Sequence, residues 1–141
     1  MAQTCRESDS AVRWGGEEFV VVARNADRAS AGSFAERVCE LFRGHSFEVG
    51  TGQIMHVTCS VGVAAFPFVD LSWREVVEMA DHGLYAAKRA GKDRWALVEA
   101  APSVQPEALR GREFSQLVTD GQLVLTLPRR AQAPLRAVAV D

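Results

Sequence analysis

The sequence predicts a domain of the mixed α/β class, on three observations. Strand-forming side chains run without interruption through residues 19–23. From residue 55 to residue 65, apolar side chains alternate with small or polar ones, which is the period-two pattern of a strand. Within residues 26–44 and 72–91, apolar side chains instead recur at helical spacing, so each of these segments is expected to form an amphipathic helix.

Length and composition limit the classes of protein to which the chain can belong. Its 141 residues are enough for one domain with a tail, and 48% hydrophobic and 24% charged residues are typical of a globular protein. The net charge of −2 gives no electrostatic basis for binding DNA. No stretch approaches the ~20 apolar residues of a membrane span, and the N-terminus lacks the layout of a signal peptide. Cys5, Cys39 and Cys59 have neither metal nor disulfide spacing, so we expect reduced thiols in a cytoplasmic protein.

The stretch that carries most chemical information is residues 13–19, Arg-Trp-Gly-Gly-Glu-Glu-Phe. Gly15 and Gly16 separate two strand-forming runs and predict a β-hairpin, because glycine adopts the positive φ of a tight hairpin turn without strain. The adjacent carboxylates of Glu17 and Glu18 repel each other, so a cation is expected beside them. Mg²⁺ bound to a phosphate-bearing ligand would suit both the carboxylates and the bare glycine backbone. The alternative, on chemistry alone, is a solvated acidic hairpin.

A second candidate site precedes this hairpin. Arg6 and Asp9 form an Arg-x-x-Asp motif, and five residues, 10–14, separate Asp9 from Gly15. Arginine can bind a phosphate or a guanine edge through two hydrogen bonds, and aspartate can accept hydrogen bonds from guanine N–H groups. The alternative is a solvated ion pair at the end of a helix, since residues 2–7 are typical of a helix C-terminus.

The predicted helices have recognisable ends. Asp27 is a candidate N-cap and Gly44 a candidate C′ residue for the first helix, on which Arg37 lies outside the apolar stripe. Ser72 and Glu75 have the spacing of a capping box at the start of the second helix.

The second helix is expected to end at Gly91. Lys88 and Lys92 are four residues apart, so we expect both on one helix face, where they could reach phosphate oxygens. Two solvated lysines near a helix C-terminus, favoured there by the helix dipole, are the alternative.

The remaining segments complete the predicted order of elements. Residues 47–49 and the run from residue 54 predict a second hairpin around Gly50-Thr51-Gly52, and Pro67 is expected to end the long strand. His56 lacks a second histidine or cysteine at ligand spacing, so we expect a structural role for it. Residues 95–98 predict a last short strand. From residue 100 to residue 141 we expect a linker at 102–106, strand character at 122–127 and a mobile end from 129.

Residues 13–19 resemble the signature of the GGDEF family, the diguanylate cyclases, in its GGEEF variant. Thr58-x-Ser60-x-Gly62 and residues 81–92 resemble two further family segments, and the resemblance covers residues 3–98. It implies a fold like that of nucleotidyl cyclases and polymerase palms, with a mostly antiparallel sheet flanked by helices. It also implies an enzyme that condenses two GTP molecules into cyclic di-GMP with Mg²⁺ or Mn²⁺, in a homodimer of such domains.

The resemblance also assigns roles to individual residues. It implies that Glu17 is a metal ligand, with Glu18 as a second catalytic residue, and that Arg6, Asp9 and Arg37 form an inhibitory site for the product. The resemblance further implies that four residues bind the substrate: Gly15, Gly16, Lys88 and Lys92. The chain departs from the family pattern at Lys92, where arginine is usual, and at Gly83, where alanine is usual.

In the family, a strand and two helices precede the signature, and that strand supplies a metal-binding aspartate. We locate neither here, so residues 1–99 are expected to be a partial GGDEF domain. A shared set of carboxylates is needed to hold two metal ions. Three interpretations therefore remain open: a fragment of a diguanylate cyclase, a module that binds cyclic di-GMP without making it, and a non-functional remnant that pairs with another chain.

Overall fold

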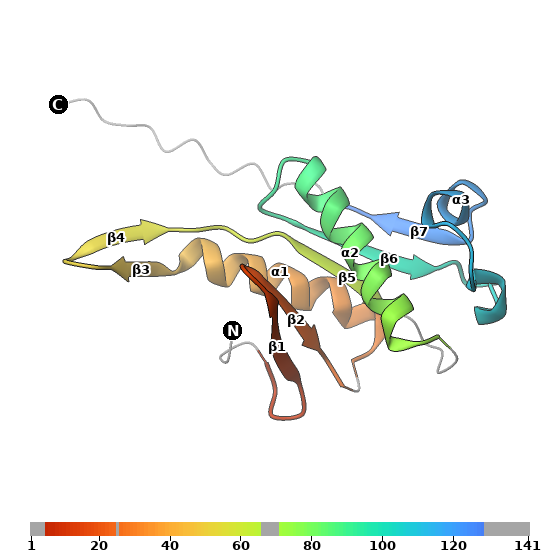
Figure 1. The fold of residues 1–141 in the computed structure, drawn as a ribbon, viewed down its shortest axis with the longest axis horizontal. Helices are drawn as coiled ribbons and strands as arrows, with labels where there is room; N and C mark the ends of the chain where they lie inside the picture. The colour runs from red at the N-terminus through yellow and green to blue at the C-terminus, as the bar shows by residue number, and fades with distance from the viewer. Residues whose placement is uncertain (1–4, 25, 66–70, 129–141) are drawn as a thin grey trace.

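A computed structural model describes residues 5–24, 26–65 and 71–128 (Figure 1). No helix in these ranges is long and apolar enough to cross a lipid bilayer. The elements, in chain order, are β1 (Ser10–Gly15), β2 (Glu18–Val22), α1 (Arg28–Gly44), β3 (Ser46–Val49), β4 (Gln53–His56), β5 (Val61–Ala65), α2 (Trp73–Arg89), β6 (Trp95–Ala100), the 3-10 turn η1 (Pro106–Leu109), α3 (Phe114–Thr119) and β7 (Leu123–Thr126).

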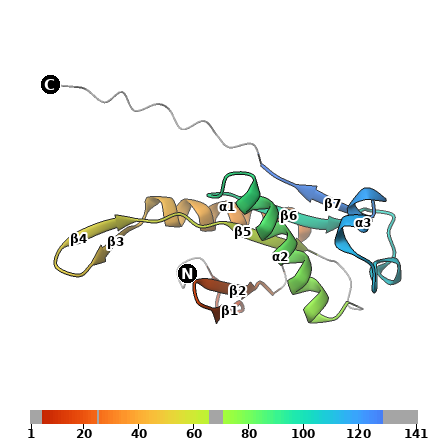
Figure 2. The same ribbon diagram turned by 45° about the horizontal axis from the view of Figure 1, so that its top comes forward.

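A three-stranded sheet forms the centre of the molecule. β6 lies in the middle, parallel to β5 and antiparallel to β7. Alternate side chains of β6 face opposite helices, because the ring of Trp95 packs at Gly32 of α1, whereas Val98 packs at Gly83 of α2. The two long helices thus cover opposite faces of the sheet, as two views show (Figures 1 and 2). This arrangement confirms the predicted mixed α/β class.

Two β-hairpins extend from this central body. β1 pairs with β2, and β3 pairs with β4, each pair forming a separate two-stranded antiparallel sheet. Both hairpins were predicted from their glycine-containing turns. Within the described residues, β2 pairs only with β1, and β5 pairs only with β6. One edge of each of these strands therefore has no partner strand among them.

The single long strand predicted over residues 55–65 is wrong. It divides into β4, which ends at His56, and β5, which begins at Val61. β4 pairs with β3 in the hairpin, whereas β5 pairs with β6 in the central sheet, so residues 57–60 pass from one sheet to the other. Alternation of side chains reports an extended backbone but not which partner strand it joins, and for that reason the pattern missed the break.

Side-chain caps begin both long helices as predicted. The Asp27 carboxylate accepts a hydrogen bond from the Ser30 backbone N–H at 2.7 Å, and Ser72 and Glu75 complete their capping box. At the other end of α1 the prediction fails, since Gly44 is its last helical residue and the extended His45 is the C-cap. The chain runs directly from α1 into β3, so no left-handed residue is needed.

Two glycines allow α2 to pack unusually close to the sheet. A Cβ atom at Gly62 of β5 would lie 1.9 Å from the carbonyl oxygen of Ala80. A Cβ atom at Gly83 of α2 would lie 3.1 Å from the carbonyl oxygen of Ala96 and 3.5 Å from the Cα atom of Gly62. Glycine at position 83 therefore has a packing role that offsets its lower helix propensity of about 1 kcal/mol.

Beyond residue 100 the sequence predicted a linker at 102–106 and strand character at 122–127. β7 confirms the strand, but the structure is packed over more of this segment than was predicted. Residues 106–126 form η1, α3 and β7, and their leucines join the core around α2 and β6. The local abundance of proline, alanine and polar residues suggested a linker, but leucines spaced too irregularly for a clear period fill the core. The buried members of the core around α2 and β6 are Met79, Val98, Ala100, Leu109, Leu117 and Leu123.

Two predictions, the end of a strand at Pro67 and a mobile segment at residues 129–141, lie outside the described residues.

Truncating Leu117 to alanine should lower the free energy of unfolding by about 2–5 kcal/mol, because the side chain is fully buried and its removal leaves a cavity. Urea denaturation followed by circular dichroism measures the loss. The matched control is Leu127→Ala, at a side chain that is 39% exposed, where we expect about 1 kcal/mol or less. Equal effects of the two substitutions would contradict a core role for residues 106–126.

Candidate functional site

The tip of the β1–β2 hairpin carries the signature residues. Gly15 ends β1, Gly16 has a φ of 52°, and Glu18 begins β2, so Gly16 and Glu17 form the turn. The Arg13 guanidinium donates to the Gly16 carbonyl oxygen from Nε at 2.9 Å and from Nη2 at 2.7 Å. This pair of hydrogen bonds holds the turn from within. Sequence reasoning missed this role, although an arginine two positions before a Gly-Gly turn is within reach of its carbonyl groups.

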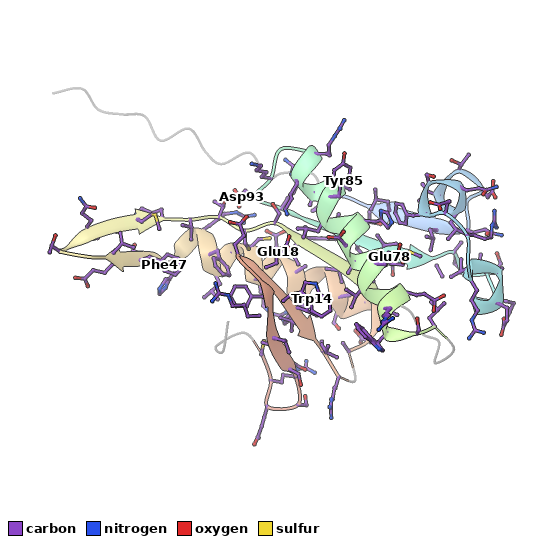
Figure 3. The ribbon with its side chains drawn as sticks, in the orientation of Figure 1. Trp14, Glu18, Phe47, Glu78, Tyr85 and Asp93 are labelled. Carbon is purple, nitrogen blue, oxygen red and sulfur yellow. The ribbon has the colours of Figure 1, made fainter. Side chains whose placement is uncertain are left out.

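The hairpin tip meets the last turn of α2. Lys88 Nζ lies 3.5 Å from Glu18 Oε1, which brings a cation beside one signature carboxylate. The side chains are 44% and 50% exposed, so solvent screens the pair and its contribution is about 0–1 kcal/mol. Glu18 lies at the end of the hairpin that reaches the body of the molecule (Figure 3). Glu17 is exposed beside it.

Lys92 does not share a helix face with Lys88, contrary to the prediction. α2 ends at Arg89, and Gly91 turns the chain with a φ of 111°. Lys92 itself has a φ of 57°, and its backbone N–H donates to the Ala87 carbonyl oxygen at 3.1 Å. Helical spacing no longer applies beyond Arg89. Of the two lysines, the structure brings Lys88 to the signature carboxylates.

Arg6 and Asp9 form a closed turn, and not the helix end expected from the sequence. The Asp9 carboxylate accepts from the Arg6 backbone N–H at 2.8 Å, and the Asp9 N–H donates to the Arg6 carbonyl oxygen at 3.0 Å. The other Asp9 oxygen accepts from the Arg24 N–H at 3.2 Å, so this side chain joins both ends of the hairpin. The hydrogen bond from the Arg6 backbone has the largest effect on the pKa of Asp9. Together with the bond from Arg24 it holds this pKa below its ordinary value.

Arg37 lies apart from this turn. Its guanidinium is 5.8 Å from the ring centroid of Phe34 on α1, and its side chain is exposed. No hydrogen bond or ion pair among the described residues joins it to Arg6 or Asp9. Arg6 lies near the start of α1, where its charge adds to the hydrogen bonds from Ser30 that lower the pKa of Asp27. The ten residues from Asp27 to Arg37 span about 15 Å of helix.

An ionic network that the sequence did not reveal attaches the turn after α2 to α1. Arg43 Nε lies 2.8 Å from Asp93 Oδ1, and Arg43 Nη1 lies 3.2 Å from Glu36 Oε1. The Trp95 indole N–H donates to the other Glu36 oxygen at 2.8 Å. Because fifty residues separate Arg43 from Asp93, no local pattern could indicate the pair.

Comparison with known families identifies the domain. A family model described as "Diguanylate cyclase, GGDEF domain" matches residues 1–94, which is well over half of the chain. The chain belongs to the GGDEF domain family. The resemblance read from the signature and from residues 81–92 is thereby confirmed.

Relatives of this GGDEF domain include proteins named as diguanylate cyclases. "Diguanylate cyclase A" of Treponema denticola is 37% identical over 92 residues, which are 65% of this chain and 24% of that protein. "Diguanylate cyclase DgcZ" of Escherichia coli is 30% identical over 100 residues, 70% of this chain and 33% of that protein. The chain therefore spans a quarter to a third of the length of these two relatives.

A solved structure supports the same fold. The crystal structure of diguanylate cyclase SiaD in complex with its activator SiaC, from Pseudomonas aeruginosa, superposes with a TM-score of 0.61 at 36% identity. The match covers 70% of this chain and 36% of that one.

The signature carboxylates of the GGDEF domain are of the type that binds magnesium, but the described residues do not complete a site. Glu17 and Glu18 offer hard oxygen ligands at the hairpin tip. Across residues 5–24, 26–65 and 71–128, no three or more histidine, cysteine, aspartate or glutamate side chains gather to hold a metal ion. Glu18 is also partnered by Lys88. The described residues alone therefore do not supply the shared set of carboxylates that two metal ions need.

Proposed function

We propose that this GGDEF domain acts in cyclic di-GMP metabolism and, when a further metal-binding carboxylate completes its site, condenses two GTP molecules into cyclic di-GMP. The observation that carries the proposal is the contact of Glu18 with Lys88, which unites an acidic signature and a basic side chain seventy residues apart. A carboxylate can bind Mg²⁺ or Mn²⁺, and a nearby lysine can neutralise phosphate charge, so the pair suits a nucleoside triphosphate held through a metal ion. We place the protein in the cytoplasm, in keeping with its three free thiols.

Each residue has a proposed role in that reaction. Glu17 would hold the metal, and Glu18 would assist at the metal or at the attacking hydroxyl. Lys88 and Lys92 would neutralise phosphate charge, and the bare backbone of Gly15 and Gly16 would admit the substrate. Two domains would face each other as a homodimer, so that each bound GTP supplies one 3′-hydroxyl and one α-phosphate. For the 141-residue chain by itself we expect no detectable synthesis.

A second candidate function is binding of cyclic di-GMP at Arg6, Asp9 and Arg37, which in a complete enzyme would inhibit synthesis. It is supported by the Arg6–Asp9 turn, in which the Arg6 backbone N–H donates to Asp9 and the Arg6 side chain is exposed. Arg37 is also exposed, but it lies apart from this turn, so a ligand that contacts all three residues would have to bridge the distance between them. Ordering these long side chains on a ligand costs conformational entropy, so we expect selective but weak binding.

Calorimetry on this chain tests the second function directly. We expect the wild-type chain to bind cyclic di-GMP more tightly than GTP, and Arg6→Ala to weaken that binding about tenfold or more, because a charge-assisted hydrogen bond is lost. Arg24→Ala is the matched control, since only the backbone N–H of Arg24 contacts Asp9. Equal affinity for the two nucleotides, or equal losses in the two variants, would rule out this site.

A further inference from the structure

Two cysteines that are far apart in the sequence face each other in the fold. Cys39 lies on α1 and is fully buried, whereas Cys59 lies between β4 and β5 and is half-buried. Cys39 Sγ is 3.9 Å from the carbonyl oxygen of Cys59, and Cys59 Sγ is 3.9 Å from the carbonyl oxygen of Val38. The contacts are reciprocal, so each sulfur reaches the backbone beside the other. Both thiols are free.

The two thiols differ in acidity because they hydrogen-bond to each other. That hydrogen bond, with burial second, raises the pKa of Cys39, and it lowers the pKa of Cys59. Cys59 is therefore the more acidic of the two thiols. The charged groups around the pair are Arg43, which favours the thiolates, and Glu36 and Asp93, which oppose them. The more acidic thiol is also the more exposed one, which is the arrangement that reacts with oxidants.

We propose that Cys39 and Cys59 are a redox-sensitive dithiol that closes to a disulfide when a peroxide oxidises Cys59. The Cys59 thiolate attacks one peroxide oxygen, the O–O bond breaks, and the leaving hydroxide takes a proton to become water. The Cys39 sulfur then attacks the sulfenic sulfur of Cys59, the S–O bond breaks, and a second water leaves with the Cys39 proton. Two thiols are oxidised and one peroxide is reduced to two waters.

The disulfide would cross-link α1 to the segment that leads into β5. It would close a loop of twenty residues around the β3–β4 hairpin. The same segment is held to the turn after α2, because the Val61 N–H donates to the Arg94 carbonyl oxygen at 3.0 Å. Closing the loop restricts the unfolded chain, so the oxidised domain is expected to unfold at a higher temperature. The inference does not depend on the proposed function.

Peptide mapping of the full chain tests the pairing. Cys5→Ser removes the third thiol and is the parent for all measurements. After treatment with hydrogen peroxide, the Cys5→Ser protein should remain a monomer, and its mass should be lower by that of two hydrogen atoms. Trypsin should then release residues 38–43 linked to residues 44–74, and a thiol reductant should separate them. Two singly oxidised thiols, or cross-links between chains only, would overturn the proposal.

Two further variants on the Cys5→Ser parent give the controls. Cys59→Ala should abolish the linked peptide and the rise in the thermal midpoint on peroxide treatment. Cys39→Ala should instead leave Cys59 as a sulfenic acid that a dimedone probe captures. If Cys39→Ala does not fold, the peptide map of the Cys5→Ser parent and the Cys59→Ala variant still test the proposal. A midpoint that rises equally in Cys59→Ala and its parent would refute the cross-link.

Discussion

Substitution of Gly62 by alanine is expected to destabilise the GGDEF domain by about 3 kcal/mol or more. The new Cβ atom would lie 1.9 Å from the Ala80 carbonyl oxygen and 2.3 Å from the Leu84 backbone nitrogen. Both obstacles are helix backbone, so α2 as a whole would have to move away from β5. A typical domain is stable by only about 5–15 kcal/mol, so a loss of this size is a large fraction of the total. Urea denaturation measures it.

The control for this substitution is Gly44→Ala, at the end of α1. Nothing lies within 4 Å of a Cβ atom there, and Gly44 does not have a left-handed φ. Alanine should therefore change stability by about 1 kcal/mol or less, and in the favourable direction, because it is the better helix former. A Gly62→Ala protein as stable as Gly44→Ala would show that α2 does not pack on β5 at backbone contact.

Loss of synthesis is the expected result of Glu17→Gln in a chimaera that places the N-terminal strand and helices of a diguanylate cyclase before residue 1. Glutamine keeps the shape of the side chain but removes the charge that holds a metal ion, so cyclic di-GMP formation should fall by about 100-fold or more. Because Glu17 is exposed, the thermal midpoint should not change. Chromatography of the products formed from GTP and Mg²⁺ gives the rate.

Two comparisons make this experiment decisive. Glu48 is also an exposed glutamate, but it lies on β3, and Glu48→Gln should leave synthesis unchanged. The purified 141-residue chain should give no detectable product under the same conditions. Efficient turnover by that chain would mean that its own residues suffice, against our expectation that a further carboxylate is required.

Several features that depend on neighbouring residues were predictable from the sequence. The Asp27 cap, the Ser72–Glu75 capping box and the positive φ at Gly16 each follow from interactions within four residues. The hairpins follow from the same local rules. The signature residues identified the family before any contact was known, because their spacing is specific.

Features that depend on distant contacts were not predictable. The break between β4 and β5 requires knowledge of the partner strands, and the burial of Leu117 requires knowledge of a helix forty residues earlier. The contact of Glu18 with Lys88, seventy residues apart, is of the same kind. The inference that placed Lys88 and Lys92 on one face was wrong because the chain leaves the helix between them.

The edges left open in β2 and β5 have a consequence for the dynamics of the domain. No ladder of backbone hydrogen bonds joins the β1–β2 hairpin to the central sheet within the described residues. An exposed ion pair at its tip and a Trp14–Trp73 ring contact are among the few side-chain links to α2. Amide hydrogens of the hairpin should therefore exchange with solvent through local openings that leave β6 protected. We therefore expect a low opening free energy for the hairpin that carries the signature, and a nucleotide or an added strand that engages it should slow this exchange.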